Sequence, residues 1–179
     1  MDISRVLLFV FLLSGCVTTR QPEANRFEVQ KITAASKATV FFFWQSQCPC
    51  VVRYQDRIER LAERYNKEGV KFIAISSNSD DSEETMLRVS QERGFKLPIM
   101  KDYDGTIAHV LGAKTTPTVV LTDAKGNIQF RGWIDNERDE GDSERIAYLE
   151  NALQDFLKTK TVAQNVSPIF GCRITRSLR

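Results

Sequence analysis

Histidine and cysteine are scarce in this chain, and neither charge sign is in clear excess. A single histidine among 179 residues excludes a metal site built from several histidines. Four cysteines are too few for a scaffold of this length held together by disulfides. Lys and Arg number 25 against 23 Asp and Glu, so the formal net charge of +2 gives no reason to expect a nucleic acid partner.

The remaining composition is typical of one globular domain. Apolar residues make up 42% of the chain and charged residues 27%, which excludes a disordered protein, a collagen-like repeat and a polytopic membrane protein. The length of 179 residues is enough for one domain with a substantial hydrophobic core, but not for two.

Residues 1–15 have the pattern of an export signal, with a basic residue followed by a short apolar run. That run, 6–13, is far shorter than the ~20 residues that a membrane-spanning helix needs. Residues 13–16 (Leu-Ser-Gly-Cys) resemble the bacterial lipobox, which implies cleavage before Cys16 and acylation of its thiol. Val17 then favours the outer membrane, by resemblance to enterobacterial sorting rules. The alternative is a plain cleaved signal with an accidental cysteine.

The mature chain predicts an α/β domain. Residues 16–36 are polar and weakly periodic, and we expect them to form a tether. Apolar runs predict strands at 38–44, 70–76, 98–100, 118–123 and 128–133, and helical periodicity predicts helices at 49–68, 83–93, 104–111 and 146–157. This order indicates a central mixed sheet with helices on both faces and an antiparallel hairpin at one edge. The domain is placed at 37–158, and a C-terminal tail at 159–179.

Cys48 lies where a thiol can be activated. It separates a buried strand from a helix that begins at Pro49, whose ring suits the first helical position. Unpaired backbone N–H groups and the helix dipole at such a position stabilise a thiolate, which is the reactive species in disulfide exchange. The polar residues 45–47 indicate a surface turn, although an inert buried cysteine is the alternative.

Cys50 and the Thr116–Pro117 pair carry weaker signals. A disulfide between Cys48 and Cys50 would close a small, strained and easily reduced ring, because side chains two residues apart in a helical turn diverge. An inward-facing residue of the first turn is the other interpretation of Cys50. Pro117 precedes a strand and is compatible with a cis peptide bond in a tight turn.

Together these segments resemble the thioredoxin superfamily, most closely its redoxin-type and membrane-anchored thiol–disulfide oxidoreductases. The resemblance is carried by residues 43–49 (Phe-Trp-Gln-Ser-Gln-Cys-Pro), 116–117 (Thr-Pro) and 123–126 (Asp-Ala-Lys-Gly). It covers about 38–157 and implies a thioredoxin fold with Cys48 as the attacking thiol. It also implies that a cis Pro117 packs against Cys48, that Trp44 lies beside the site, and that Pro49 and Thr116 contribute to substrate binding.

The resolving thiol is the main departure from this family. Val51 occupies the position of the second cysteine in the usual Cys-x-x-Cys motif. Residues 170–174 (Phe-Gly-Cys-Arg-Ile) resemble a Gly-Cys-x-Ile tail found in one redoxin-like subgroup, which also has Cys-Pro followed by Arg-Tyr as at 53–54. The resemblance therefore favours Cys172 as the partner of Cys48. Cys50 remains the alternative, and Cys172 could instead be an incidental thiol.

The expected function is thiol–disulfide exchange at the cell envelope, on a lipid-anchored protein that faces the periplasm. Cys48 would attack a substrate disulfide and Cys172 or Cys50 would resolve the intermediate, without a cofactor. The expected partners are protein disulfides or dithiols and a membrane or periplasmic redox donor.

Three other functions are weighed against this one. A copper-binding module would use Cys48, Cys50 and His109 as ligands for Cu(I). A peroxiredoxin-like peroxidase is disfavoured, because Phe41 and Gln45 stand where the peroxidatic motif has Pro and Thr. A redox-inert scaffold would keep only the fold.

Overall fold

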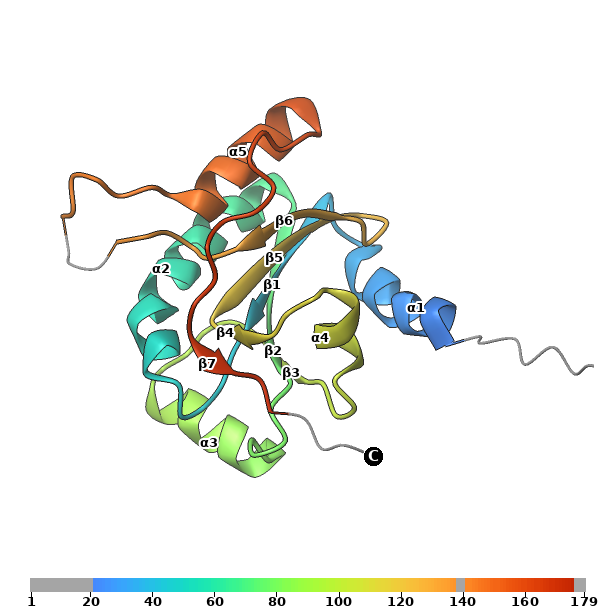
Figure 1. Cartoon of the computed structure of the whole chain (residues 1–179), viewed down its shortest axis with the longest axis vertical. Coiled ribbons are helices and arrows are strands. Elements are labelled where there is room, and N and C mark those ends of the chain that lie inside the picture. The colour runs from blue at the N-terminus through green and yellow to red at the C-terminus, as the bar shows by residue number, and fades with distance from the viewer. Residues whose placement is uncertain (1–20, 138–140, 176–179) are drawn as a thin grey trace, which may run out of the picture.

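A computed structural model describes residues 21–137 and 141–175, and the predictions for the signal segment and Cys16 lie outside these ranges. Five strands form a mixed sheet in the order β3-β2-β1-β5-β6 (Figure 1). They are β1 (Ala38–Phe43), β2 (Val70–Ser76), β3 (Ile99–Lys101), β5 (Thr118–Asp123) and β6 (Ile128–Gly132). β1 runs parallel to β2 and antiparallel to β5, and β5 and β6 form the edge hairpin. The predicted fold class is confirmed.

Helices cover both faces of the sheet, which explains why the central strand is apolar at almost every position. The helices are α1 (Gln21–Thr33), α2 (Pro49–Tyr65), the short 3₁₀ helix η1 (Asn66–Glu68), α3 (Glu83–Glu92), α4 (Thr106–Val110) and α5 (Tyr148–Thr159). Val40 and Phe42 of β1 pack in one core cluster with residues of α2 and α5. Phe41 and Phe43 point to the other face and pack with residues of α1 and α4.

The predicted tether at 16–36 is wrong for the part that forms α1. Val29 of α1 is 1% exposed and packs in the core cluster with Phe41 and Ile107. The Thr33 hydroxyl donates a hydrogen bond to the Ala124 carbonyl at 3.2 Å. The sequence conceals this helix because only a few apolar residues face the domain, so its hydrophobic periodicity is weak.

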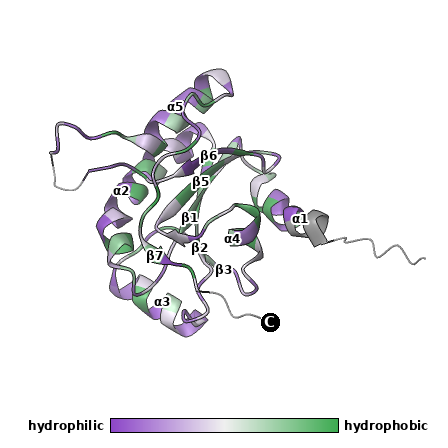
Figure 2. Cartoon of the chain, in the orientation of Figure 1, coloured by the Kyte–Doolittle hydropathy of each residue, from purple (hydrophilic) through white to green (hydrophobic). Residues whose placement is uncertain are grey.

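The segment after α5 is a packed part of the domain (Figure 1). It returns along β6, where the Arg131 N–H donates to the Asn165 carbonyl at 3.0 Å. It ends at β7 (Cys172–Arg173), which pairs antiparallel with β4 (Thr115–Thr116). Gly132 makes this path possible, because a Cβ there would lie 2.0 Å from the Ser167 Oγ. Hydrophilic and hydrophobic residues mix along the helices (Figure 2), and among the described residues no helix is long and apolar enough to cross a membrane.

Candidate active site

Cys48 is the N-cap residue of α2, immediately before Pro49 in the first turn. Its side chain is 1% exposed, and its Sγ lies 3.3 Å from the Thr116 carbonyl oxygen. Burial alone would raise the pKa of this thiol. Hydrogen bonds from the Cys172 side chain and from the Val51 backbone are among the causes that outweigh burial and lower the pKa. The surroundings of Cys48 therefore favour its thiolate form.

The turn before Cys48 is fixed by Asp81 and Arg93, which the sequence analysis does not single out, together with Gln45 and Thr116. The buried carboxylate of Asp81 accepts hydrogen bonds from both the backbone N–H, at 3.0 Å, and the hydroxyl of Ser46. Arg93 donates to the Ser46 carbonyl at 2.5 Å. Gln45 accepts a hydrogen bond from the Thr116 hydroxyl at 3.2 Å, which ties the turn to β4. These contacts position Cys48 without touching its sulfur.

The Thr116–Pro117 peptide bond is cis, as the family resemblance implies. Both residues are buried, and Thr116 contributes the carbonyl that faces Cys48. Trp44, in contrast, has 0% exposure and stacks on Phe95 at a centroid distance of 6.1 Å. Trp44 is thus a core residue directly after β1 and presents no surface to a substrate.

Cys172 lies opposite Thr116 in the β4–β7 pair, which brings its side chain to Cys48. Burial, the hydrogen bond with Cys48 and the negative charge of Cys48 together raise the pKa of Cys172 to about 12. The lowered pKa of Cys48 and the raised pKa of Cys172 are the shifts expected when the Cys172 thiol donates a hydrogen bond to the Cys48 sulfur. The structure therefore brings together the two cysteines that the resemblance pairs.

Gly171 permits this close approach. Its φ of +138° is a conformation that other residues rarely adopt, and a Cβ there would lie 2.1 Å from the Thr116 oxygen. Beyond Cys172, the buried Ile174 anchors the tail, and its N–H donates to the Lys114 carbonyl at 2.9 Å. The tail therefore holds Cys172 from both sides.

Cys50 is half-buried in the first turn of α2 and carries a free thiol. Burial first, and then the charge of Cys48, raise its pKa. Cys48 and Cys172 are also free thiols in the structure, so the described site is in its dithiol form. Since the pKa of Cys50 is raised and that of Cys48 is lowered, Cys50 is the weaker nucleophile of these two cysteines.

His109 does not join the cysteines, and the ligand set predicted for the copper alternative is not assembled. His109 is exposed on α4, whose neighbours Ile107 and Ala108 pack on the opposite face of the sheet from α2. Within 21–137 and 141–175, no group of three His, Cys, Asp or Glu side chains is arranged to hold a metal ion.

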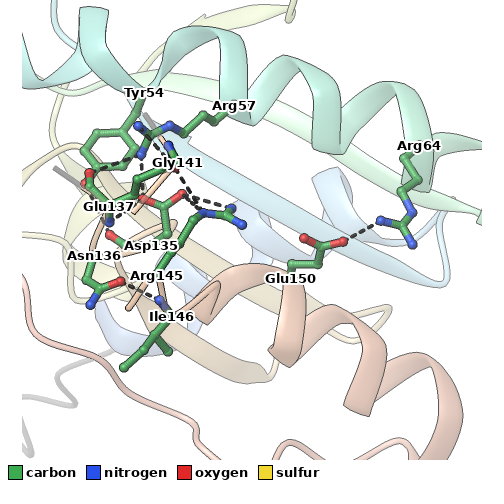
Figure 3. A network of polar contacts seen from close by, with 10 residues as sticks. All are labelled: Tyr54, Arg57, Arg64, Asp135, Asn136, Glu137, Gly141, Arg145, Ile146 and Glu150. Atoms are coloured by element: carbon green, nitrogen blue, oxygen red, sulfur yellow. Dashed lines mark hydrogen bonds and ion pairs between the residues drawn. The ribbon is translucent and has the colours of Figure 1, made fainter. Parts of the chain in front are cut away.

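An ion-pair network connects α2 with the segment that follows β6 (Figure 3). The fully buried Asp135 accepts from the Arg57 Nη1 at 2.6 Å and from the Arg145 Nη2 at 3.1 Å. Glu137 pairs with the same two arginines, at 3.3 and 3.1 Å. The Tyr54 hydroxyl donates to the Asp135 carbonyl at 3.2 Å, which links α2 to the segment after β6.

Replacing Asp135 with asparagine is expected to destabilise the domain by about 2–3 kcal/mol. This is below the ~3–5 kcal/mol typical of a broken buried pair, because Glu137 still pairs with both arginines. Chemical denaturation of Asp135→Asn, with Asp56→Asn as an exposed control on α2, measures the difference. Equal stability of the two variants would contradict a structural role for the network.

The comparisons with known proteins agree with this geometry. The Redoxin family model matches residues 17–149, and the chain belongs to the redoxin family. It is 29% identical over 106 residues to the thiol-disulfide oxidoreductase ResA of Halalkalibacterium halodurans, a match that covers 59% of this chain and 58% of that protein. The chain thus spans less than two thirds of this curated relative.

Two solved structures share most of the fold. An uncharacterized conserved protein from Geobacillus kaustophilus has a TM-score of 0.72 and 29% identity, covering 83% of this chain and 82% of its own. A hypothetical protein from Sinorhizobium meliloti has a TM-score of 0.70 and 26% identity, covering 86% and 85%. Both support a thioredoxin-like fold over nearly the whole domain.

Proposed function

We propose that this redoxin is a thiol–disulfide oxidoreductase in which Cys48 attacks and Cys172 resolves. The single observation that carries the proposal is the pairing of β4 with β7, which sets Cys172 opposite Thr116 and beside the Cys48 sulfur. The similarity to ResA, named as a thiol-disulfide oxidoreductase, supports the same reaction class.

In the first step, the Cys48 thiolate attacks one sulfur of a substrate disulfide. A bond forms between that sulfur and Cys48 Sγ, the substrate S–S bond breaks, and the second substrate sulfur leaves as a thiolate that takes a proton from solvent. In the second step, Cys172 loses its proton to solvent and its thiolate attacks Cys48 Sγ. The bond between Cys48 and the substrate breaks, the substrate sulfur leaves as a thiolate that takes a proton from solvent, and the protein holds a Cys48–Cys172 disulfide.

The first step itself activates the second thiol. While Cys48 is a thiolate, burial, the hydrogen bond with Cys48 and the charge of Cys48 together raise the pKa of Cys172 to about 12. Once Cys48 is bonded to the substrate, it carries no charge and accepts that hydrogen bond poorly. Two of the causes that hold the proton on Cys172 then disappear, so its pKa falls and it becomes able to attack. Cys172 thus becomes a reactive nucleophile only after the mixed disulfide has formed.

The cellular setting belongs to the same proposal. Acylation of Cys16 would anchor the protein to a bacterial membrane, facing the periplasm, with the outer membrane favoured by Val17. Protein disulfides or dithiols would be the substrates, and a membrane or periplasmic redox partner would reset the Cys48–Cys172 pair.

The pH dependence of Cys48 alkylation tests whether Cys172 lowers the pKa of Cys48. In the reduced protein, the rate is expected to rise with pH through a midpoint below the ~8.5 of a free thiol. Cys172→Ala removes the hydrogen-bond donor and is expected to move the midpoint upward, whereas Cys172→Ser keeps a donor and is expected to move it less. Both variants are measured in a Cys50→Ser background, so that Cys48 is the thiol counted. An unchanged midpoint in Cys172→Ala would contradict the role of Cys172 in stabilising the thiolate.

A further inference from the structure

The tail occupies the backbone edge that lies next to the reactive sulfur. β7 pairs with β4 over two residues, Thr115 opposite Arg173 and Thr116 opposite Cys172. The pairing continues with the hydrogen bond from the Ile174 N–H to the Lys114 carbonyl, at 2.9 Å. A substrate strand approaching β4 would meet an edge whose hydrogen bonds are already made.

The tail also covers the sulfur. Cys48 forms no disulfide in the structure, yet its side chain is only 1% exposed. The Cys172 side chain lies beside the Cys48 Sγ and forms a hydrogen bond with it. Disulfide exchange requires a substrate sulfur to come within bonding distance of Cys48 Sγ. A protein disulfide therefore needs the place that the tail holds.

The tail is fastened by contacts away from the sulfurs. Ile174 is 7% exposed and packs in the core cluster with Ile107 and Ala113. The Thr175 N–H donates to the Asn78 Oδ1 at 2.9 Å, and the Thr175 carbonyl accepts from the Ser79 N–H at 2.9 Å. These contacts keep the strand in place without a disulfide.

We propose that β4 is a docking edge for which the tail and the substrate compete, and that the tail shows which partner fits. The partner is an extended segment with glycine before its cysteine and an aliphatic residue two positions after it. Glycine is required because any Cβ at the Gly171 position meets the Thr116 oxygen. An aliphatic residue is required because Ile174 fills an apolar site, while Arg173 between them is exposed and free to vary. This inference rests on the proposed reaction of Cys48.

Loosening the tail is expected to speed the attack on an external disulfide. Ile174→Ser is compared with Ile169→Ser, the same change at an exposed position of the same tail, both in a Cys172→Ser background that stops after the first step. The substrate is a peptide of tail residues 167–175 whose cysteine is disulfide-bonded to a chromophoric aromatic thiol. Cys48 attacks the peptide sulfur and the aromatic thiolate leaves, so its absorbance counts the reaction.

We expect Ile174→Ser to react about tenfold faster than Ile169→Ser, because a site covered part of the time reacts in proportion to its open fraction. Equal or slower reaction of Ile174→Ser would overturn the competition. Thermal unfolding of each variant shows whether the domain remains folded. If the Ile174→Ser variant does not fold, Thr175→Pro replaces it. This change removes the N–H that contacts Asn78, and the same acceleration is expected.

The peptide itself tests the sequence preference. A second peptide with alanine in place of the glycine is expected to react about tenfold more slowly, and equal rates would overturn the fit. A failure of Cys48 to react with any peptide in the Ile169→Ser control would contradict the proposed function. Reaction of the control without acceleration by the loosened tail would contradict this inference alone.

Discussion

Cys48→Ser is expected to abolish disulfide exchange, leaving less than about a thousandth of the wild-type rate. A serine hydroxyl at this position is protonated at neutral pH and cannot replace the thiolate whose pKa the site lowers. A dithiol-coupled assay of protein disulfide reduction measures the loss.

Cys50→Ser is the matched control, because it makes the same change two residues away in the same turn of α2. It is expected to retain most of the activity. A loss in Cys50→Ser as large as that in Cys48→Ser would assign the chemistry to both cysteines of this turn and contradict the role given to Cys172.

The second large effect is the trapping of an intermediate. Cys172→Ser is expected to accumulate a mixed disulfide between Cys48 and the substrate, with release slowed on the order of a hundredfold or more. The reason is the loss of a neighbouring nucleophile, whose intramolecular attack exceeds that of dilute external thiols by orders of magnitude. Non-reducing gel electrophoresis of the reaction with a protein disulfide shows the adduct directly.

The control for trapping is the double variant Cys48→Ser/Cys172→Ser, which is expected to form no adduct. Rapid release from Cys172→Ser, with a Cys48–Cys50 disulfide left behind, would instead identify Cys50 as the resolving thiol. The two outcomes separate the alternatives that the sequence leaves open.

The central part of this fold follows from local patterns in the sequence. The continuous apolar run at β1 requires cover on both faces, and the helical spacing after Pro49 defines the buried stripe of α2, which includes Val51, Ile58 and Leu61. Cys48 could be placed at the N-terminus of this helix for the same reason. Each of these signals lies within one segment of the chain, so it can be recognised without knowledge of the tertiary structure.

The packing of the termini could not be predicted in this way. α1 buries too few apolar residues to show a clear period, and the tail after α5 shows no period because its backbone hydrogen bonds go to β6 and β4. The position of Cys172 depends on contacts between distant segments, above all at Gly132 and Gly171. The glycine directly before Cys172 is the signal in the sequence that could have indicated this close approach.

The roles of individual polar residues could not be predicted from the sequence either. Ser82 caps α3 by accepting a hydrogen bond from the Thr85 N–H at 3.1 Å. Asp81, one residue earlier, turns inward and holds the Ser46 turn before Cys48. Two neighbouring polar residues thus stabilise different parts of the fold, and only the tertiary structure shows which residue has which role.

Disulfide mapping of the mildly oxidised protein tests whether Cys48 pairs with Cys172. After free thiols are blocked, digestion without reductant and mass spectrometry identify the linked peptides. We expect a link between Cys48 and Cys172, with Cys50 recovered as a blocked thiol. A Cys48–Cys50 link, or three blocked thiols, would contradict this pairing.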